Sequence, residues 1–225
     1  MLVKEILQDI FYTIKYIKNN DPSISFTIEF LLYPIFYALI LHRISHQMYI
    51  LRIPFIPRLL SQISRFFTSI EIHPGAQIGK GLFIDHGAGV VIGQTAIIGD
   101  FCLLYQGVTL GGNGKEIGKR HPILGNNIVV GAGAIVLGRI TVGDNSKIGA
   151  GSVIVKDIPK FSTVVGVPGK IIYKNTGQDI KQCFHDRLTQ LEYPDLLQKL
   201  QDQLNECQLK IQQLELLTAT DNVIK

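Results

Sequence analysis

The chain has 225 residues, of which 46% are hydrophobic and 18% are charged, so it is long and apolar enough to bury a core. Its formal net charge of +4 is mild, which suits a small anionic ligand and does not favour a nucleic-acid partner. The three cysteines form no close pair, so neither a disulfide framework nor a zinc site is indicated, and a reducing compartment is favoured.

Residues 1–70 contain no glycine and show the apolar spacing of helices, as at Leu2, Ile6 and Ile10. We therefore predict an α-helical N-terminal domain over 1–70, with its last short helix at about 58–67. The start MLVKEILQDI mixes charged and amide residues into its apolar ones, unlike a signal peptide. The apolar run 30–41 is shorter than the ~20 residues of a membrane span, so no membrane association is expected.

From Ile72 onwards an aliphatic residue recurs every six positions, and glycine follows many of these residues directly. This hexapeptide repeat predicts a parallel β-helix over 71–175, with each aliphatic side chain pointing into the coil. The fold class is therefore mainly β with helical appendages. The repeat positions are Ile72, Ile78, Ile84, Ile92, Ile98, Leu104, Leu110, Leu124, Val130, Val136, Val142, Ile148 and Ile154.

The repeat is interrupted twice, and insertions in repeat proteins are frequent places for function. The spacing is eight residues between Ile84 and Ile92, and fourteen between Leu110 and Leu124. Both interruptions contain a histidine with a charged neighbour, Asp85-His86 and Arg120-His121. Histidine is suited to accept a proton near neutral pH, so His86 is the candidate catalytic base. A metal site is disfavoured, because a catalytic zinc needs three ligands and Arg120 would repel a cation.

The tail, 176–225, contains a seam of apolar residues spaced three and four apart from Leu197 to Leu214. This spacing predicts a coiled-coil helix, which favours a trimer; a single amphipathic helix packed on the β-helix is the alternative.

The stretches IEIHPGAQIGKGLFIDHGAGVVIG, YQGVTLGGNGK, GKRHP, VVGAGAIVLG, KIGAGSVIVKDIP and VVGVPGK resemble those of bacterial and plant-type serine acetyltransferases. The resemblance runs from about Asp21 to Lys170. It implies a left-handed parallel β-helix, a homotrimer with active sites between subunits, and no permanently bound cofactor. The implied reaction transfers acetyl from acetyl-CoA, the co-substrate, to the hydroxyl of L-serine. The product is O-acetylserine, in the first step of cysteine biosynthesis from serine.

The resemblance also assigns roles to residues around the first interruption. His86 matches the general base of the family, and Glu71 falls where some members have an aspartate that orients this histidine. Glutamate is one methylene longer but can still accept the imidazole N–H.

The same resemblance implies that serine is bound by Asp85, Arg120 and His121. An acid for the ammonium group and a guanidinium for the carboxylate fit an amino-acid substrate. Asp21 matches an acidic residue that reaches a site in a neighbouring chain, although it could equally cap a helix.

Acetyl-CoA is expected to lie along the β-helix. Gly112 and Asn113 fall at its reactive end, and Ala132, Gly133 and Ala150 fall along the pantetheine path, where small residues let backbone amides approach.

The sequence departs from the family pattern at several positions. Asn113 replaces a usual threonine, and Gln94 stands where glutamate is common. The ending NVIK lacks the terminal isoleucine that many members insert into cysteine synthase, so that partner is not assumed. The short first helical segment favours a trimer over a dimer of trimers. We expect a cytoplasmic protein, with the plastid stroma as the alternative.

The residues at the two interruptions also bear on three other functions. A hexapeptide acetyltransferase for a sugar or antibiotic hydroxyl would also use a loop histidine, but the Asp85 and Arg120 pair favours a zwitterionic acceptor. A γ-type carbonic anhydrase would need more histidines, and a non-enzymatic trimeric scaffold would not need charged residues at both interruptions.

Overall fold

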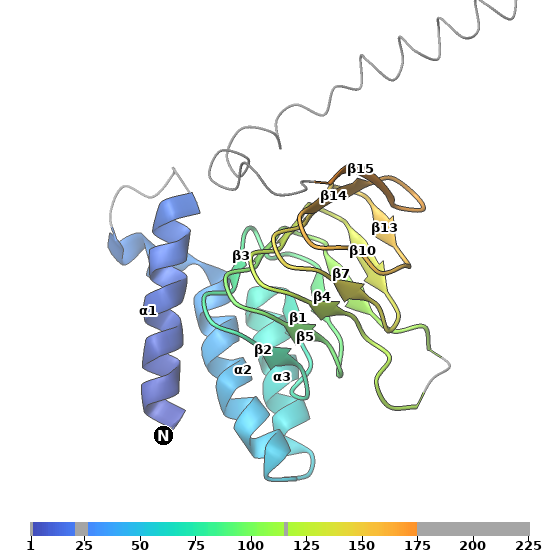
Figure 1. Ribbon diagram of the computed structural model, residues 1–225. Coiled ribbons are helices and arrows are strands. Elements are labelled where there is room, and N and C mark those ends of the chain that lie inside the picture. The colour runs from blue at the N-terminus through green and yellow to red at the C-terminus, as the bar shows by residue number, and fades with distance from the viewer. Residues whose placement is uncertain (1, 21–26, 115–116, 175–225) are drawn as a thin grey trace, which may run out of the picture. The chain divides into compact units, whose positions relative to one another are not determined.

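The computed structural model describes residues 2–20, 27–114 and 117–174. Residues Met1–Thr176 form one compact unit, in which helices lie against one end of a coil of short strands (Figure 1). The predicted tail helix and Asp21 lie outside the described residues.

Helices occupy the N-terminal part, as the apolar spacing predicts. They are α1 (Leu2–Asn20), the 3-10 helix η1 (Thr27–Leu32), α2 (Pro34–Ile50) and α3 (Ile56–Thr68). Pro34 stands at the first turn of α2, where its missing N–H leaves no helical bond unmade. No helix of the described residues is long and apolar enough to cross a membrane.

The remainder is a parallel β-solenoid, which confirms the predicted fold. Every third strand joins the same sheet, so one coil contributes one strand to each of three sheets. The strands are β1 (Ile70–Ile72), β2 (Gln77–Ile78), β3 (Phe83–Ile84), β4 (Val90–Ile92), β5 (Ile97–Ile98), β6 (Leu103–Leu104), β7 (Thr109–Gly111), β8 (Ile123–Leu124), β9 (Val129–Val130), β10 (Ile135–Leu137), β11 (Thr141–Val142), β12 (Lys147–Ile148), β13 (Val153–Ile154), β14 (Ser162–Val165) and β15 (Lys170–Lys174).

Three sheets result from this winding. One has five strands in the order β1-β4-β7-β10-β13, a second has four (β11-β8-β5-β2), and a third has six (β15-β14-β12-β9-β6-β3). All pairs are parallel except β14 with β15, which closes the coil. The five-stranded sheet carries the candidate site, because both interruptions of the repeat border it.

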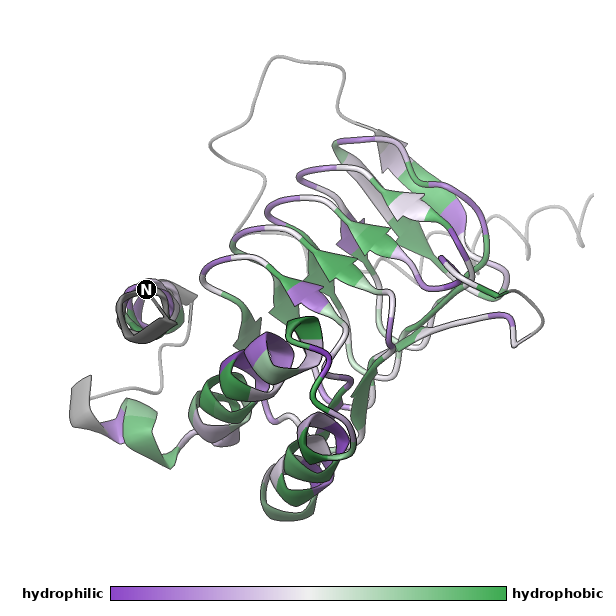
Figure 2. Ribbon diagram, turned by 90° about the horizontal axis from the view of Figure 1, so that it is seen from below, coloured by the Kyte–Doolittle hydropathy of each residue, from purple (hydrophilic) through white to green (hydrophobic). Residues whose placement is uncertain are grey.

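The core of the coil consists of the predicted repeat positions, all thirteen of which are buried. Figure 2 shows hydrophobic colour along the strands and more polar colour at the corners between them. Ala88 also falls at an inward position of the repeat, four residues after Ile84, but it is exposed and Val90 is buried instead. The two extra residues of the first interruption lie within 85–89, so they shift the inward position by two.

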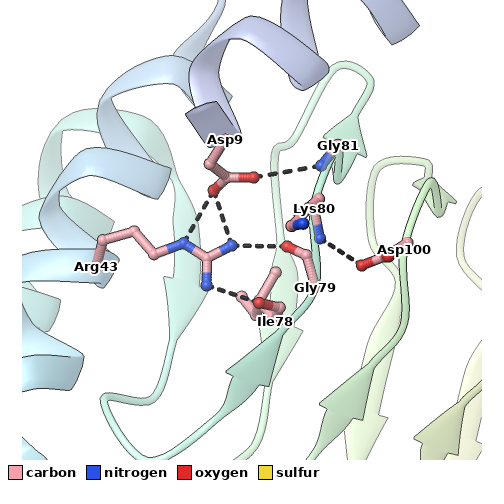
Figure 3. Close-up of polar contacts among 7 residues, drawn as sticks. All are labelled: Asp9, Arg43, Ile78, Gly79, Lys80, Gly81 and Asp100. Atoms are coloured by element: carbon pink, nitrogen blue, oxygen red, sulfur yellow. Dashed lines mark hydrogen bonds and ion pairs between the residues drawn. The ribbon is translucent and has the colours of Figure 1, made fainter. Parts of the chain in front are cut away.

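A largely buried ion pair joins α1 and α2 to the coil (Figure 3). Arg43 of α2 binds Asp9 of α1 at 2.7 Å and donates to the carbonyls of Ile78 and Gly79, at 2.6 Å each. The second carboxylate oxygen of Asp9 accepts the N–H of Gly81 at 3.2 Å. Two helices and one turn of the coil therefore meet at a single cluster, just before the strand that leads to His86.

Candidate active site

The first interruption forms a tight turn that presents His86 to solvent. The backbone of His86 has φ 59°, a left-handed conformation that is uncommon for a residue with a side chain. Gly87 and Gly89 also have positive φ, and the Gly89 N–H donates at 3.0 Å to the carbonyl of Ser69, the C-cap of α3 just before β1. The turn is thereby anchored, while the His86 side chain is 74% exposed. A strained backbone with an exposed titratable side chain is a frequent feature of functional sites.

Asp85 and His86 form the acid and imidazole pair of this turn. The Oδ1 atom of Asp85 lies 3.8 Å from Nε2 of His86, and the Asp85 side chain is 21% exposed. The Asp85 N–H donates to the Leu104 carbonyl of the next coil at 2.9 Å. The ladder of the β-solenoid therefore holds the backbone of the pair in place, and the His86 side chain stays exposed to solvent.

Glu71 lies in β1, with its carboxylate between two arginines of α3. Its oxygens are 3.2 Å from Arg58 and 3.3 Å from Arg65. Within the described part of this chain, no hydrogen bond joins Glu71 to His86. The orienting role of Glu71 stays a prediction.

The second interruption is fixed to the turn after β4. The Thr95 hydroxyl accepts the N–H groups of Arg120 and His121, each at 3.1 Å, and Lys119 Nζ donates to the Thr95 carbonyl. His121 is only 8% exposed. Burial lowers the pKa of His121 below its ordinary value of 6.5, and the Arg120 and Lys119 charges lower it further.

Gln94 connects this segment to α2. Its Oε1 accepts from the Arg120 guanidinium at 2.8 Å, and its Nε2 donates to the Tyr49 hydroxyl at 3.0 Å. One terminal nitrogen of Arg120 is therefore held, and other guanidinium N–H groups are available for an anionic group. The departure to glutamine thus keeps a polar tether for Arg120 without adding a negative charge.

The structure places the two histidines at opposite ends of the strands of the five-stranded sheet. The turn 85–89 precedes β4, so Asp85 and His86 lie where the strands of this sheet begin. Arg120 and His121 bind Gln94 and Thr95, which follow β4, so they lie where the strands end. We call these the start side and the end side. A single chain therefore does not bring the two interruptions together.

The residues predicted to bind acetyl-CoA are divided in the same way. Ala132 and Gly133 precede β10 and Ala150 precedes β13, on the start side, whereas Gly112 and Asn113 follow β7, on the end side. Backbone hydrogen bonds stack the start-side turns, with Gly133 N–H donating to the Gln106 carbonyl and Gly151 N–H to the Ala132 carbonyl, both at 2.8 Å. On the end side, a Cβ on Gly112 would lie 3.1 Å from the Arg120 side chain.

Among the described residues, no group of three or more histidine, cysteine and acidic side chains is arranged to hold a metal ion. Thr95, Arg58 and Arg65 are contacts that sequence reasoning missed. Thr95 follows Ile92-Gly93-Gln94, as in any other turn of the repeat, and no local signal marks it.

Comparisons with known proteins agree with this fold. The profile described as "Bacterial transferase hexapeptide (six repeats)" matches residues 121–156. A serine acetyltransferase of Synechococcus elongatus is 54% identical over 193 residues, covering 83% of this chain and 79% of that protein.

Two solved structures are also similar to the chain. The serine acetyltransferase of Neisseria gonorrhoeae in complex with serine has 40% identity and a TM-score of 0.72, covering 76% of this chain and 70% of that one. The Brucella abortus enzyme in complex with coenzyme A has 38% identity and a TM-score of 0.75, covering 78% and 70%. With relatives this similar over most of both chains, the chain belongs to the serine acetyltransferase family.

Proposed function

We propose that this chain transfers the acetyl group of acetyl-CoA to the hydroxyl of L-serine, giving O-acetylserine and CoA, as the first step of cysteine biosynthesis. The observation that carries the proposal is the placement of His86, an exposed imidazole on an anchored, strained turn beside a carboxylate. The serine and coenzyme A complexes of the solved relatives support the choice of both substrates.

His86 acts as the general base in this proposal. It takes the proton of the serine hydroxyl while the hydroxyl oxygen attacks the thioester carbonyl carbon. The tetrahedral intermediate then collapses, the carbon–sulfur bond breaks, and the imidazolium returns the proton to the departing thiolate. Glu71 supports the imidazolium, by analogy with the acid of a catalytic triad.

The amino acid is held by charges of both signs. The Asp85 carboxylate receives the ammonium group, and Arg120 with His121 receives the carboxylate. The tether from Gln94 holds Arg120 in a defined position for this contact. A neutral sugar offers no charge that complements Asp85 or Arg120, which disfavours it as the acceptor.

The active enzyme in this proposal is a homotrimer whose sites lie between subunits. The separation of the start side from the end side supports it, because a second copy would have to supply the other half of each site. The outer face of α3 supports it further. Its exposed apolar residues include Phe55 at its N-cap, Leu59, Ile63, Phe66 and Phe67, and exposed apolar patches frequently mark protein interfaces.

We also propose a cytoplasmic location. The support is Cys102, a free and buried thiol, which is typical of proteins kept in a reducing compartment.

The direct test incubates the purified protein with acetyl-CoA and L-serine and follows free thiol with a thiol reagent. O-acetylserine is identified by mass spectrometry. D-serine, a sugar and a hydroxyl-bearing antibiotic replace L-serine in matched reactions.

We expect thiol release to depend on L-serine. If release with L-serine is no faster than hydrolysis without an acceptor, while another hydroxyl compound is acetylated, the proposed function is wrong.

A further inference from the structure

The Thr95 hydroxyl lies at the centre of the contacts that hold His121. Thr95 belongs to the turn after β4, and His121 ends the second interruption, 26 residues later in the chain. Six contacts from this turn reach the segment 119–121: five through Thr95, and one from Gln94 to Arg120.

The hydrogen bonds of the Thr95 hydroxyl determine where its proton points. Its oxygen accepts two backbone N–H groups, those of Arg120 and His121, at 3.1 Å each. A hydroxyl has two acceptor lone pairs and one proton, so both lone pairs are used. The third contact of the oxygen is Nδ1 of His121 at 2.9 Å, and the hydroxyl proton therefore points to that nitrogen.

A second donor reaches the same nitrogen. The Thr95 backbone N–H donates to Nδ1 of His121 at 3.2 Å. A nitrogen that accepts hydrogen bonds carries a lone pair, so the ring proton of a neutral imidazole must be on Nε2. Both Thr95 donors therefore select the same tautomer, in which Nε2–H is the donor.

Packing fixes the plane of the ring as well as its tautomer. A Cβ built on Gly93 would overlap Cδ2 and Nε2 of His121, so the ring lies directly against the Gly93 backbone. In the described part of the chain the hydrogen bonds of the ring are all at Nδ1, and Nε2–H has no acceptor there. The ring is thus held rigidly with one donor unused.

Burial and the nearby positive charges both favour the neutral form of the ring. Burial lowers the pKa of His121 most, and Arg120 and Lys119 on its own segment lower it further. His73, just after β1, is near enough to interact with His121. A neutral imidazole with its proton on Nε2 is a poor general base through that nitrogen but a good hydrogen-bond donor.

We propose that Thr95 is a positioning residue that holds His121 as the neutral Nε2–H tautomer, a fixed donor for a carboxylate oxygen of bound serine beside Arg120. The two histidines then have separate duties, His86 moving the proton and His121 donating a hydrogen bond. The inference rests on the proposed function for the identity of the ligand, but the tautomer is a property of the protein alone.

The first test observes the tautomer in the full-length wild-type protein. Long-range proton–nitrogen NMR spectra of ¹⁵N-histidine-labelled protein distinguish Nδ1–H from Nε2–H, and a His121→Asn sample identifies the signals of His121. We expect a lone pair on Nδ1 and the proton on Nε2 at neutral pH. A proton on Nδ1 would overturn the proposal, and this readout needs neither substrate nor a Thr95 variant.

The second test compares Thr95→Val with Thr95→Ser. Valine keeps the shape but removes the hydroxyl, whereas serine keeps it. We expect Thr95→Val to raise KM for serine on the order of tenfold, with KM for acetyl-CoA unchanged and the tautomer signal of His121 mixed. Thr95→Ser should restore both KM and the signal.

A Thr95→Val variant with wild-type KM and tautomer, or a Thr95→Ser variant as impaired as Thr95→Val, would show that Thr95 only fills space. If L-serine instead fails as an acceptor for the wild-type protein while the NMR result holds, the proposed function fails and the tautomer assignment stands.

Discussion

His86 combines a strained backbone with an exposed side chain, and each property has a separate cause. The positive φ belongs to the turn between β3 and β4, where the chain carries its two extra residues. A non-glycine residue in this conformation costs about 1–2 kcal/mol. The side chain makes few contacts with its own chain, so its identity matters little to folding. Residue-scale substitutions can therefore separate chemistry from stability here.

His86→Asn should abolish most of the turnover without affecting the fold. Asparagine tolerates the left-handed conformation but cannot accept the serine proton, so we expect a rate loss on the order of 10²–10⁴. Steady-state thiol release measures the rate, and thermal unfolding with acetyl-CoA binding serves as the control. Turnover close to wild type would exclude His86 as the base.

Gly93→Ala should damage the site through a single methyl group. The new Cβ would overlap the His121 ring, so the segment 119–121 must shift, at about 1–3 kcal/mol of unfolding free energy. Urea denaturation and serine KM measure the two effects. In the double variant with His121→Ala the overlap is gone, so stability should recover while activity does not. Equal instability of the single and double variants would contradict this account.

At the scale of elements, the ion pair between Asp9 and Arg43 decides how the helices meet the coil. Both side chains are largely buried, and each makes further hydrogen bonds to the backbone of Ile78, Gly79 or Gly81 (Figure 3). A buried pair adds little net stability relative to an apolar pair, but losing one partner leaves an uncompensated charge.

We expect Arg43→Met to lower the free energy of unfolding by about 3–5 kcal/mol, because Asp9 keeps only the Gly81 N–H. Adding Asp9→Leu should recover part of this loss. Chemical denaturation of the two single variants and the double variant gives the coupling energy. Additive losses would mean that the two side chains act independently.

At the scale of the whole molecule, several histidines make stability depend on pH. Burial lowers the pKa of His42 well below 6.5, with a further contribution from Arg43. Burial also lowers the pKa of His73 to about 4, and Arg58 contributes. In the unfolded chain these groups bind protons below pH ~6.5, whereas in the folded chain they do not.

The free energy of unfolding should therefore fall as the pH falls from about 6.5 toward 4, since the unfolded state takes up more protons over that range. His42→Leu removes one of these groups and should flatten the slope. Urea midpoints measured at several pH values test this. An unchanged slope in the variant would remove His42 from the explanation.

The proposed trimer gives a second prediction at this scale. Phe66 and Phe67 are 82% and 77% exposed in the single chain, so Phe66→Glu with Phe67→Glu should leave the monomer fold intact. We expect light scattering to show monomers and the activity to disappear, because each chain holds only half of a site. Phe11→Glu, at another exposed aromatic, is the matched control. An active monomer would exclude a site shared between subunits.

The sequence predicts nearly all of the buried positions of the β-solenoid, because a six-residue period constrains each of them. The two extra residues shift that period at Ala88, and only the structure shows which residues within 85–89 are displaced. The helices followed from apolar spacing, although α3 begins at Ile56 rather than at 58.

The β-solenoid, the two interruptions and the histidine in each can be predicted from the sequence, since all three are local patterns along the chain. The tertiary structure is needed to see that the interruptions lie at opposite ends of the strands of one sheet. It also shows that Thr95 and Gln94 hold His121 and Arg120. These contacts join residues 26 positions apart, because one coil stacks on the next. The six-residue period does not reveal them, since it is the same whether or not a turn residue binds a residue of the next coil.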